Sequence, residues 1–204
     1  MNSKKPKVHI IYCHPSKKSI TYKIREAYIR GLKKKNIDYT LTDLYDSKFN
    51  PDISEEEYLR ENNNKNYQLS EEILREQEKI NAASLLTFIF PLFWMDAPSK
   101  LVGYFSRVFT KGFKYDDDYG NEATMKTMDK TNFLISTGSS YETLKEDGKI
   151  SALETIFIKD RLAGKTKETG MYFFTETTYM KEKELNKLKE HIKKAEEIGQ
   201  EVIS

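Results

Sequence analysis

The segment at residues 85–90, LLTFIF, is apolar at all but one position and shows no alternation between apolar and polar side chains. A strand with one face in water alternates, whereas an unbroken apolar run is typical of a central strand that is covered on both faces. The run stops at Pro91 and continues as Leu-Phe-Trp-Met, which is unusually aromatic for a loop. A chain with such a strand must supply helices to both faces of its sheet.

The other segments of the chain alternate between strand and helix character. Short β-branched or apolar runs predict strands at residues 8–12, 37–41, 85–90, 131–136 and 171–174. Apolar residues at spacings of three and four predict helices at residues 19–35, 54–60, 70–83, 99–110, 150–162 and 181–202, with Ser70 as the N-cap of the third. Parallel neighbours need crossover connections, so this alternation predicts a three-layer, doubly wound α/β sandwich with a five-stranded parallel sheet in the order 2-1-3-4-5.

Composition narrows the class of protein. A chain of 204 residues can bury a core large enough to need no disulfides, so we expect a single domain over residues 1–204. Cys13 is the only cysteine, which suits a reducing compartment, and we expect a cytoplasmic protein. The net charge of +2 is too balanced to predict nucleic-acid or membrane-surface binding.

Neither a signal peptide nor a membrane-spanning helix is predicted. The basic start MNSKKPK is followed by only five residues of strand character, and the longest strongly apolar stretch, residues 85–95, is about half of what a bilayer crossing requires. The segments ENNNKN at 61–66 and YDDDYG at 115–120 are interpreted as polar surface loops. Because the balanced charge predicts neither nucleic-acid nor membrane-surface binding, we expect a small-molecule partner.

Three loops follow the first, third and fourth predicted strands: CHPSKKSIT, PLFWMDAP and STGSSY. In an open parallel sheet, ligands bind beyond the carboxyl ends of the strands, where the strand order reverses. The order 2-1-3-4-5 makes these three strands neighbours. The three loops are therefore expected to share one crevice.

The first loop has the chemistry of a phosphate cradle. It offers the His14 ring, the hydroxyls of Ser16, Ser19 and Thr21, and the backbone N–H groups that open the next helix. It has no glycine, so neither a dinucleotide fingerprint nor a nucleoside-triphosphate loop is predicted. The alternative interpretation is that Ser16 or Ser19 only caps the helix and His14 lies at the surface.

The second loop suits a flat, electron-poor ring such as an isoalloxazine. Backbone amides can meet the polar edge of the ring while apolar side chains cover its face. The loop residues available are Pro91, Leu92, Phe93, Trp94 and Met95. The alternative interpretation places Phe93 and Trp94 in the core or in a dimer interface, since aromatic residues also anchor interfaces.

The third loop combines small residues, which allow a ligand to approach the backbone closely, with a tyrosine hydroxyl that can donate a hydrogen bond or a proton. Its sequence is Thr137-Gly138-Ser139-Ser140-Tyr141. The alternative interpretation is an ordinary turn from a strand into a helix.

Three stretches together resemble the flavodoxin-like NAD(P)H:quinone reductase family, which includes DT-diaphorase, the modulator-of-drug-activity proteins and the ancillary flavoproteins of potassium-efflux systems. They are HPSKKSIT at 14–21, DLYDSKFNP at 43–51 and PLFWMDAPSKLVGYFSRVFTKGFKY at 91–115. The resemblance runs nearly from end to end of the chain. It departs from the family at Phe93, where many relatives have glutamine or another polar residue, and at 142–149, where the family histidine is missing.

The resemblance implies a flavin site and its residues. The flavin phosphates would meet His14, Ser19 and Thr21, with Ser16 and Ile20 as further cofactor-binding residues. The ring would be bordered by Pro91, Leu92, Phe93, Trp94 and Met95. Thr137, Gly138, Ser139 and Tyr141 would close over the ring, with Tyr141 as the catalytic residue beside the reacting edge. The cofactor implied is FAD, on the resemblance of residues 54–83 to FAD-binding members, with FMN as the alternative. No metal site is predicted.

The activity implied is two-electron, ping-pong hydride transfer from NAD(P)H to a quinone or similar acceptor by a homodimer. The alternatives are a flavin-binding ancillary subunit of a potassium-efflux system and a reductase of azo or nitro compounds. A one-electron flavodoxin is disfavoured, because such carriers usually have a strongly acidic docking face. Arg107, Lys111 and Lys114 are interpreted as a solvated helix face rather than as ligands of a 2′-phosphate.

Overall fold

The protein is described by a computed structural model over residues 7–62, 67–177 and 185–203. Its centre is a five-stranded sheet in the order β2-β1-β3-β4-β5, and every neighbouring pair is parallel. The strands are β1 Lys7–Tyr12, β2 Asp38–Asp43, β3 Leu85–Pro91, β4 Met128–Ser136 and β5 Thr166–Phe174. The predicted fold class and strand order are confirmed.

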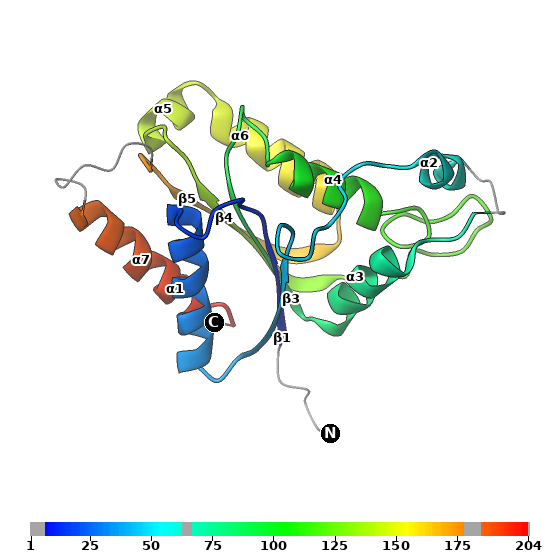
Figure 1. Ribbon diagram of the computed structural model, residues 1–204, viewed down its shortest axis with the longest axis horizontal. Coiled ribbons are helices and arrows are strands. Elements are labelled where there is room, and N and C mark those ends of the chain that lie inside the picture. The colour runs from blue at the N-terminus through cyan, green and yellow to red at the C-terminus, as the bar shows by residue number, and fades with distance from the viewer. Residues whose placement is uncertain (1–6, 63–66, 178–184, 204) are drawn as a thin grey trace.

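Helices cover both faces of the sheet. On one face lie α1 Ile20–Lys34 and α7 Leu185–Gln200 (Figure 1). On the other face lie α3 Glu71–Ala82, α4 Ser99–Val108, α5 Tyr141–Glu146, α6 Lys149–Glu154 and the π-helix η1 Thr155–Leu162. The short helix α2 Glu55–Glu61 sits away from the sheet, beside the far end of α4 (Figure 1). No helix within these described ranges is long and apolar enough to cross a membrane.

β3 is buried on both faces, as its composition predicts. Phe88 and Phe90 belong to the core on the α3–α4 side, where Phe88 stacks on Phe133 of β4 with ring centroids 5.2 Å apart. Ile89 belongs to the core on the α1–α7 side. Thr87, the one polar residue of the run, accepts or donates a 2.8 Å hydrogen bond with the buried hydroxyl of Tyr28 on α1. The strand therefore needs both helical layers.

The region between β4 and β5 differs from the prediction. The helix predicted at 150–162 is present, but it is not one α-helix, because α6 ends at Glu154 and continues as the π-helix η1 to Leu162. The wide turns of η1 fall on a stretch with several β-branched residues, which are less favourable in an α-helix. β5 begins at Thr166 rather than at residue 171, because its first residues lie on the exposed edge of the sheet and carry no apolar signal.

Helix α5 was not predicted, because it has only six residues and one buried apolar side chain. The local signal for it is Ser140, whose side chain accepts the N–H of Thr143 as an N-cap. The predicted cap at Ser70 is confirmed by its contact with the N–H of Ile73. Residues 181–184 of the predicted terminal helix and 63–66 of the first polar loop lie outside the described residues, whereas the loop at 115–120 is largely exposed.

The interpretation of the basic residues around α4 as a solvated face is wrong for two of them. Arg107 is 8 % exposed and makes a bidentate contact with Glu57 of α2 at 2.6–3.0 Å, so it docks α2 onto α4. Lys114 is 3 % exposed and donates to the carbonyl of Asp160 at 2.8 Å. Both are structural cations, and Lys111 pairs with Asp118 at 2.9 Å.

A buried carboxylate joins the helical layer to the sheet at the β1–β2 edge. Glu76 of α3 is 6 % exposed and accepts hydrogen bonds from Thr42 of β2 at 2.9 Å and from Tyr104 of α4 at 3.1 Å. Lys79 and His9 also approach it, with the His9 Nε2 atom 3.7 Å away. Burial alone would raise the pKa of Glu76, but His9, Lys79 and Thr42 together outweigh burial and lower that pKa from 4.5 to about 2.

We expect Glu76→Gln to lower the free energy of unfolding at neutral pH by roughly 2–4 kcal/mol, because the ionised carboxylate is favoured in the folded state. The folded pKa lies below the unfolded one, so this stabilisation is complete above pH 4.5 and is lost as the pH falls toward 2. Urea unfolding at several pH values measures it. Glu71→Gln, at an exposed pair on the same helix, is the control. An equal loss at pH 3 and pH 7 would contradict the explanation.

Candidate functional site

The three predicted loops meet at the carboxyl edge of the sheet. The N–H of Leu92 after β3 donates to the carbonyl of Ser136 at the end of β4, at 2.8 Å. The hydroxyl of Thr21, in the first turn of α1, lies 2.7 Å from the hydroxyl of Ser136. The N–H of Cys13 after β1 donates to the carbonyl of Ile89, at 3.0 Å. Parallel register therefore brings the three loops together.

The first loop is held by its own side chains. The N–H of Ser16 donates to Nδ1 of His14 at 2.9 Å, and Ser19 is the N-cap of α1, accepting the N–H of Tyr22 at 3.0 Å. The capping interpretation of Ser19 is confirmed. Burial lowers the pKa of half-buried His14, so its ring is neutral at pH 7. Because Nδ1 accepts a hydrogen bond, the hydrogen-bond pattern assigns the ring proton to Nε2, which is a donor.

Thr21 differs from the other candidates of the first loop. It is 3 % exposed, and its hydroxyl is already bonded to Ser136, so it joins α1 to β4. What it and Ile20 add to an anion site is the backbone N–H groups of the first helical turn, which have no acceptor inside a helix.

The second loop contains a strained two-residue turn. Phe93 and Asp96 exchange backbone hydrogen bonds of 2.8 and 2.9 Å, and the residues between them, Trp94 and Met95, have φ values of 50° and 65°. Turns with two left-handed residues usually use Asn-Gly, because a side chain there costs roughly 1–2 kcal/mol per residue. Phe93 is 45 % exposed and Trp94 fully exposed, so the interpretation of these two as core residues is wrong.

An ion pair that the sequence did not reveal anchors this turn. Arg161 of η1 donates to both carboxylate oxygens of Asp96, at 2.9 and 3.1 Å, and the N–H of Ala97 donates to the same carboxylate at 2.7 Å. The guanidinium stacks over the rings of Phe105 and Phe157 at 5.0 and 4.6 Å. Of this ion pair, the sequence drew attention only to Asp96, because it directly follows the aromatic residues of the second loop.

The third loop is tied to the loop after β5. Thr137 is 5 % exposed, and its carbonyl accepts both the N–H and the hydroxyl of Thr177, at 2.9 and 3.0 Å. The N–H of Glu176 donates to the carbonyl of Ser139 at 3.1 Å. Tyr141 opens α5 and is 47 % exposed, with its ring edge packed on Phe173. The loop is thus a strand-to-helix turn that also leaves the tyrosine hydroxyl accessible, and the residues 175–177 that support it were not predicted.

A cavity of about 780 Å³ lies beside the aromatic turn. Its lining comes from the segment before α2, which includes Ile53, from the second loop with Phe93 and Trp94, and from α4. The first and third loops, which the structure describes in full, contribute no lining residue to it.

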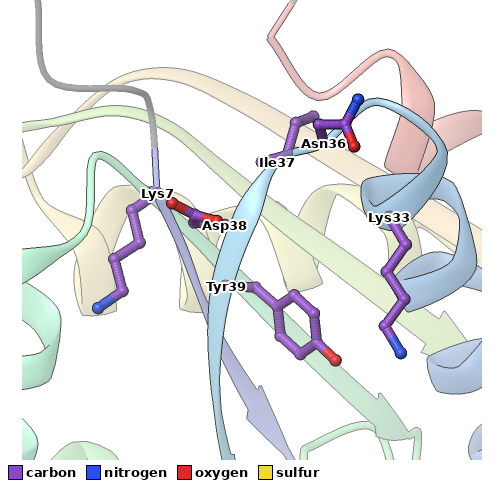
Figure 2. A pocket seen from close by; sticks show the side chains of 6 residues that line it. All are labelled: Lys7, Lys33, Asn36, Ile37, Asp38 and Tyr39. Atoms are coloured by element: carbon purple, nitrogen blue, oxygen red, sulfur yellow. The ribbon is translucent and has the colours of Figure 1, made fainter.

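A second hollow, of about 590 Å³, lies at the opposite end of the sheet, between the start of β1, the end of α1 and the start of β2 (Figure 2). Lys7 and Lys33 lie on either side of β2 there, and none of the three loops contributes. No cluster of three or more His, Cys, Asp or Glu side chains suited to a metal ion occurs in the described part of the chain.

The family model described as the flavodoxin-like fold matches residues 6–197. The chain belongs to this family. The membership confirms the predicted fold class and the resemblance drawn from the three sequence stretches.

Relatives of this flavodoxin-like protein are oxidoreductases by name. It is 31 % identical over 150 residues to an uncharacterized NAD(P)H oxidoreductase of Haemophilus influenzae, covering 73 % of each chain. It is 38 % identical over 120 residues to NAD(P)H dehydrogenase (quinone) 1 of Cavia porcellus, covering 52 % of this chain and 44 % of that one. The matches thus span about half the length of such mammalian relatives.

Solved structures give the same family picture. The NAD(P)H:quinone oxidoreductase from Methanothermobacter marburgensis superposes with a TM-score of 0.89 at 30 % identity, covering 98 % of both chains. An FMN-dependent NADH-azoreductase from Bacillus anthracis has a TM-score of 0.69 at 18 % identity, over 98 % of this chain and all of that one, and shows the shared fold alone.

The bond between Thr21 and Ser136 predicts a coupled stability effect. We expect Thr21→Val to lower the free energy of unfolding by about 1–3 kcal/mol, because it leaves the buried Ser136 hydroxyl without a partner. Thr21→Ser keeps the hydroxyl and should change little. Adding Ser136→Ala to Thr21→Val should cost less than the sum of the single changes, as measured by a double-mutant cycle in urea. Strict additivity would contradict the coupling.

Proposed function

We propose that the protein is a flavin-dependent NAD(P)H oxidoreductase that reduces quinones or similar acceptors by two-electron, ping-pong hydride transfer. The observation that carries this proposal is the meeting of three loops at one sheet edge, with helix-opening N–H groups, an exposed aromatic turn and an accessible tyrosine. The relative from Methanothermobacter marburgensis, alike over 98 % of both chains, supports it by its name.

The residues present fit a flavin. The Nε2–H of neutral His14 and the first-turn N–H groups at Ile20 and Thr21 would hold its phosphates, with Ser16 and Ser19 shaping the loop around them. The exposed ring of Trp94 and the neighbouring Phe93 would cover a flat face, beside Pro91, Leu92 and Met95. When bound, the flavin supplies the chemistry of accepting a hydride from NAD(P)H and passing it to the acceptor.

This chain's own contribution is position and hydrogen bonding. The third loop is fixed from both ends, and groups fixed in advance stabilise developing negative charge without reorganising. The N–H of Thr137 already donates to the carbonyl of Phe174 and that of Ser139 to the hydroxyl of Thr137, so the N–H of Gly138 is the amide that the proposal assigns to this role. Tyr141 is the proposed catalytic residue, because its accessible hydroxyl can donate a hydrogen bond or a proton to the acceptor oxygen. With no histidine at 142–149, Tyr141 acts without the family's relay partner.

The finer parts of the proposal are FAD as the cofactor, with FMN as the alternative, a homodimer as the working form, and the cytoplasm as the location. The resemblance of residues 54–83, which contain α2 and α3, supports FAD. The exposed Phe93 and Trp94 support a partner surface, since exposed aromatic side chains are enriched at interfaces. The single cysteine supports a reducing compartment.

The test is to purify the protein and record its visible spectrum. We then expect titration with FAD or FMN to quench Trp94, the chain's only tryptophan, and loaded protein to oxidise NADH or NADPH with a quinone. An azo dye as acceptor separates quinone from azo reduction. Flavin binding with no oxidation beyond slow air turnover would instead favour an ancillary flavin-binding role. Failure to bind either flavin at micromolar concentration would sink the proposal.

Tyr141→Phe tests the catalytic assignment. We expect unchanged flavin content and a kcat with quinone lowered roughly tenfold or more, because one hydrogen bond to the reacting oxygen is lost. Steady-state kinetics on matched, flavin-loaded samples measure the effect. Tyr39→Phe, at the opposite end of the sheet, is the control. Equal rates for wild type and Tyr141→Phe would remove Tyr141 from the mechanism.

A further inference from the structure

We propose that Arg161, which lies on the π-helix and outside the three loops, is a positioning residue for the flavin loop. Through Asp96 it holds Trp94 and Met95 in the left-handed backbone conformation that presents Trp94 outward. This inference rests on the proposed flavin function and deepens it, because it names a determinant of the cofactor site that no local sequence pattern indicates.

The turn needs a restraint from outside. It contains no glycine or asparagine, yet two consecutive residues with full side chains have φ values of 50° and 65°. Within the turn, the two backbone hydrogen bonds between Phe93 and Asp96 close the loop. Residues in sparsely populated backbone regions persist only where the surrounding structure over-determines them. The restraint must therefore act at an end of the turn.

Asp96, at the C-terminal end of the turn, receives that restraint. Its carboxylate accepts from both terminal nitrogens of Arg161 at 2.9 and 3.1 Å and from the N–H of Ala97 at 2.7 Å. Two parallel N–H···O bonds fix orientation as well as distance. At the other end of the turn, the N–H of Leu92 is held by the carbonyl of Ser136. Both ends are thus fixed to separate parts of the fold.

Arg161 is itself held in place. Its side chain is 13 % exposed, and its guanidinium lies over Phe105 of α4 and Phe157 of η1. Phe157 is fully buried and packs on Phe90 of β3 at 5.2 Å. Arg161 therefore connects the turn to the hydrophobic core beneath β3, the strand that leads into the turn. A lysine would keep the charge but neither the planar stacking nor the two-point bond.

Arg161 acts through Asp96, so replacing Arg161 should change the conformation of the second loop and not the hydride-transfer step itself. Trp94 reports on the loop directly, because it is the only tryptophan and is fully exposed. In flavin-free protein, we expect Arg161→Met and Asp96→Asn to lower the steady-state fluorescence anisotropy of Trp94. Arg161→Met retains a long apolar side chain over the phenylalanine rings. Arg30→Met, which removes an arginine ion pair on the α1–α7 side, should leave the anisotropy unchanged.

In titrations with FMN and with FAD, we expect Arg161→Met to raise the dissociation constant at least tenfold, with Arg161→Lys intermediate and Arg30→Met at the wild-type value. Glycine adopts the left-handed conformation without steric cost. The loss caused by Arg161→Met should therefore be smaller when measured in a Met95→Gly background. Such a rescue is not expected if Arg161 only adds general stability, which thermal unfolding of each variant monitors.

The outcomes separate the two proposals. Lower Trp94 anisotropy together with weaker flavin binding supports the positioning role. Wild-type flavin affinity in Arg161→Met overturns it, whether or not the anisotropy changes, and so does an equal loss with and without Met95→Gly. If the wild-type protein binds no flavin, the proposed function fails. In that case the Trp94 anisotropy alone tests whether Arg161 restrains the turn. An anisotropy in Arg161→Met equal to that of the wild type would overturn this claim as well.

Discussion

β3 packs against helices on both of its faces. This two-sided burial fixes the position of the loops at the carboxyl edge of the sheet, where ligands bind in such folds. Phe88 and Phe90 point to one core and Ile89 to the other, and each buried side chain of this size contributes roughly 1.5–3 kcal/mol. A slip of one residue would exchange the two faces and place the polar Thr87 against Phe133. The register with β1 and β4 is therefore strongly specified, and Pro91 must lie opposite Ser136.

The parts of the fold that depend on local patterns were predictable from the sequence, and those that depend on distant partners were not. The unbroken run of β3 and the amphipathic α1 were visible as periodicities, and Ser70 was visible as a cap. The burial of Arg107 was not, because its partner Glu57 is 50 residues away on a helix that has no buried residues of its own. The π-helix was not predictable either, because the apolar residues at 150–162 indicate a helix without indicating which type of helix.

The residues of the candidate site also separate into those that local sequence indicates and those that only distant contacts reveal. His14, Trp94 and Tyr141 could be selected from the sequence because their residue types are unusual for loops. The contacts that hold those loops join positions 115 residues apart, at Thr21 and Ser136, and 65 residues apart, at Asp96 and Arg161. No spacing rule reaches such pairs, since they become neighbours only after the sheet has formed. The residue types therefore predict which groups contact a ligand, which stays a prediction, whereas only the tertiary structure reveals the groups that hold those loops in place.

The stability of the buried strand β3 allows the strained turn that follows it. The left-handed residues Trp94 and Met95 cost about 1–2 kcal/mol each, which is small beside the burial of β3 that precedes them. Strain of this size relaxes unless both ends of the segment are fixed, and here one end is tied to β4 and the other to Arg161. An exposed tryptophan on a strained turn adds nothing to the stability of the free protein. The proposed flavin site supplies a physical rationale, because an aromatic ring held rigidly in water loses little further entropy when a flat ligand covers it.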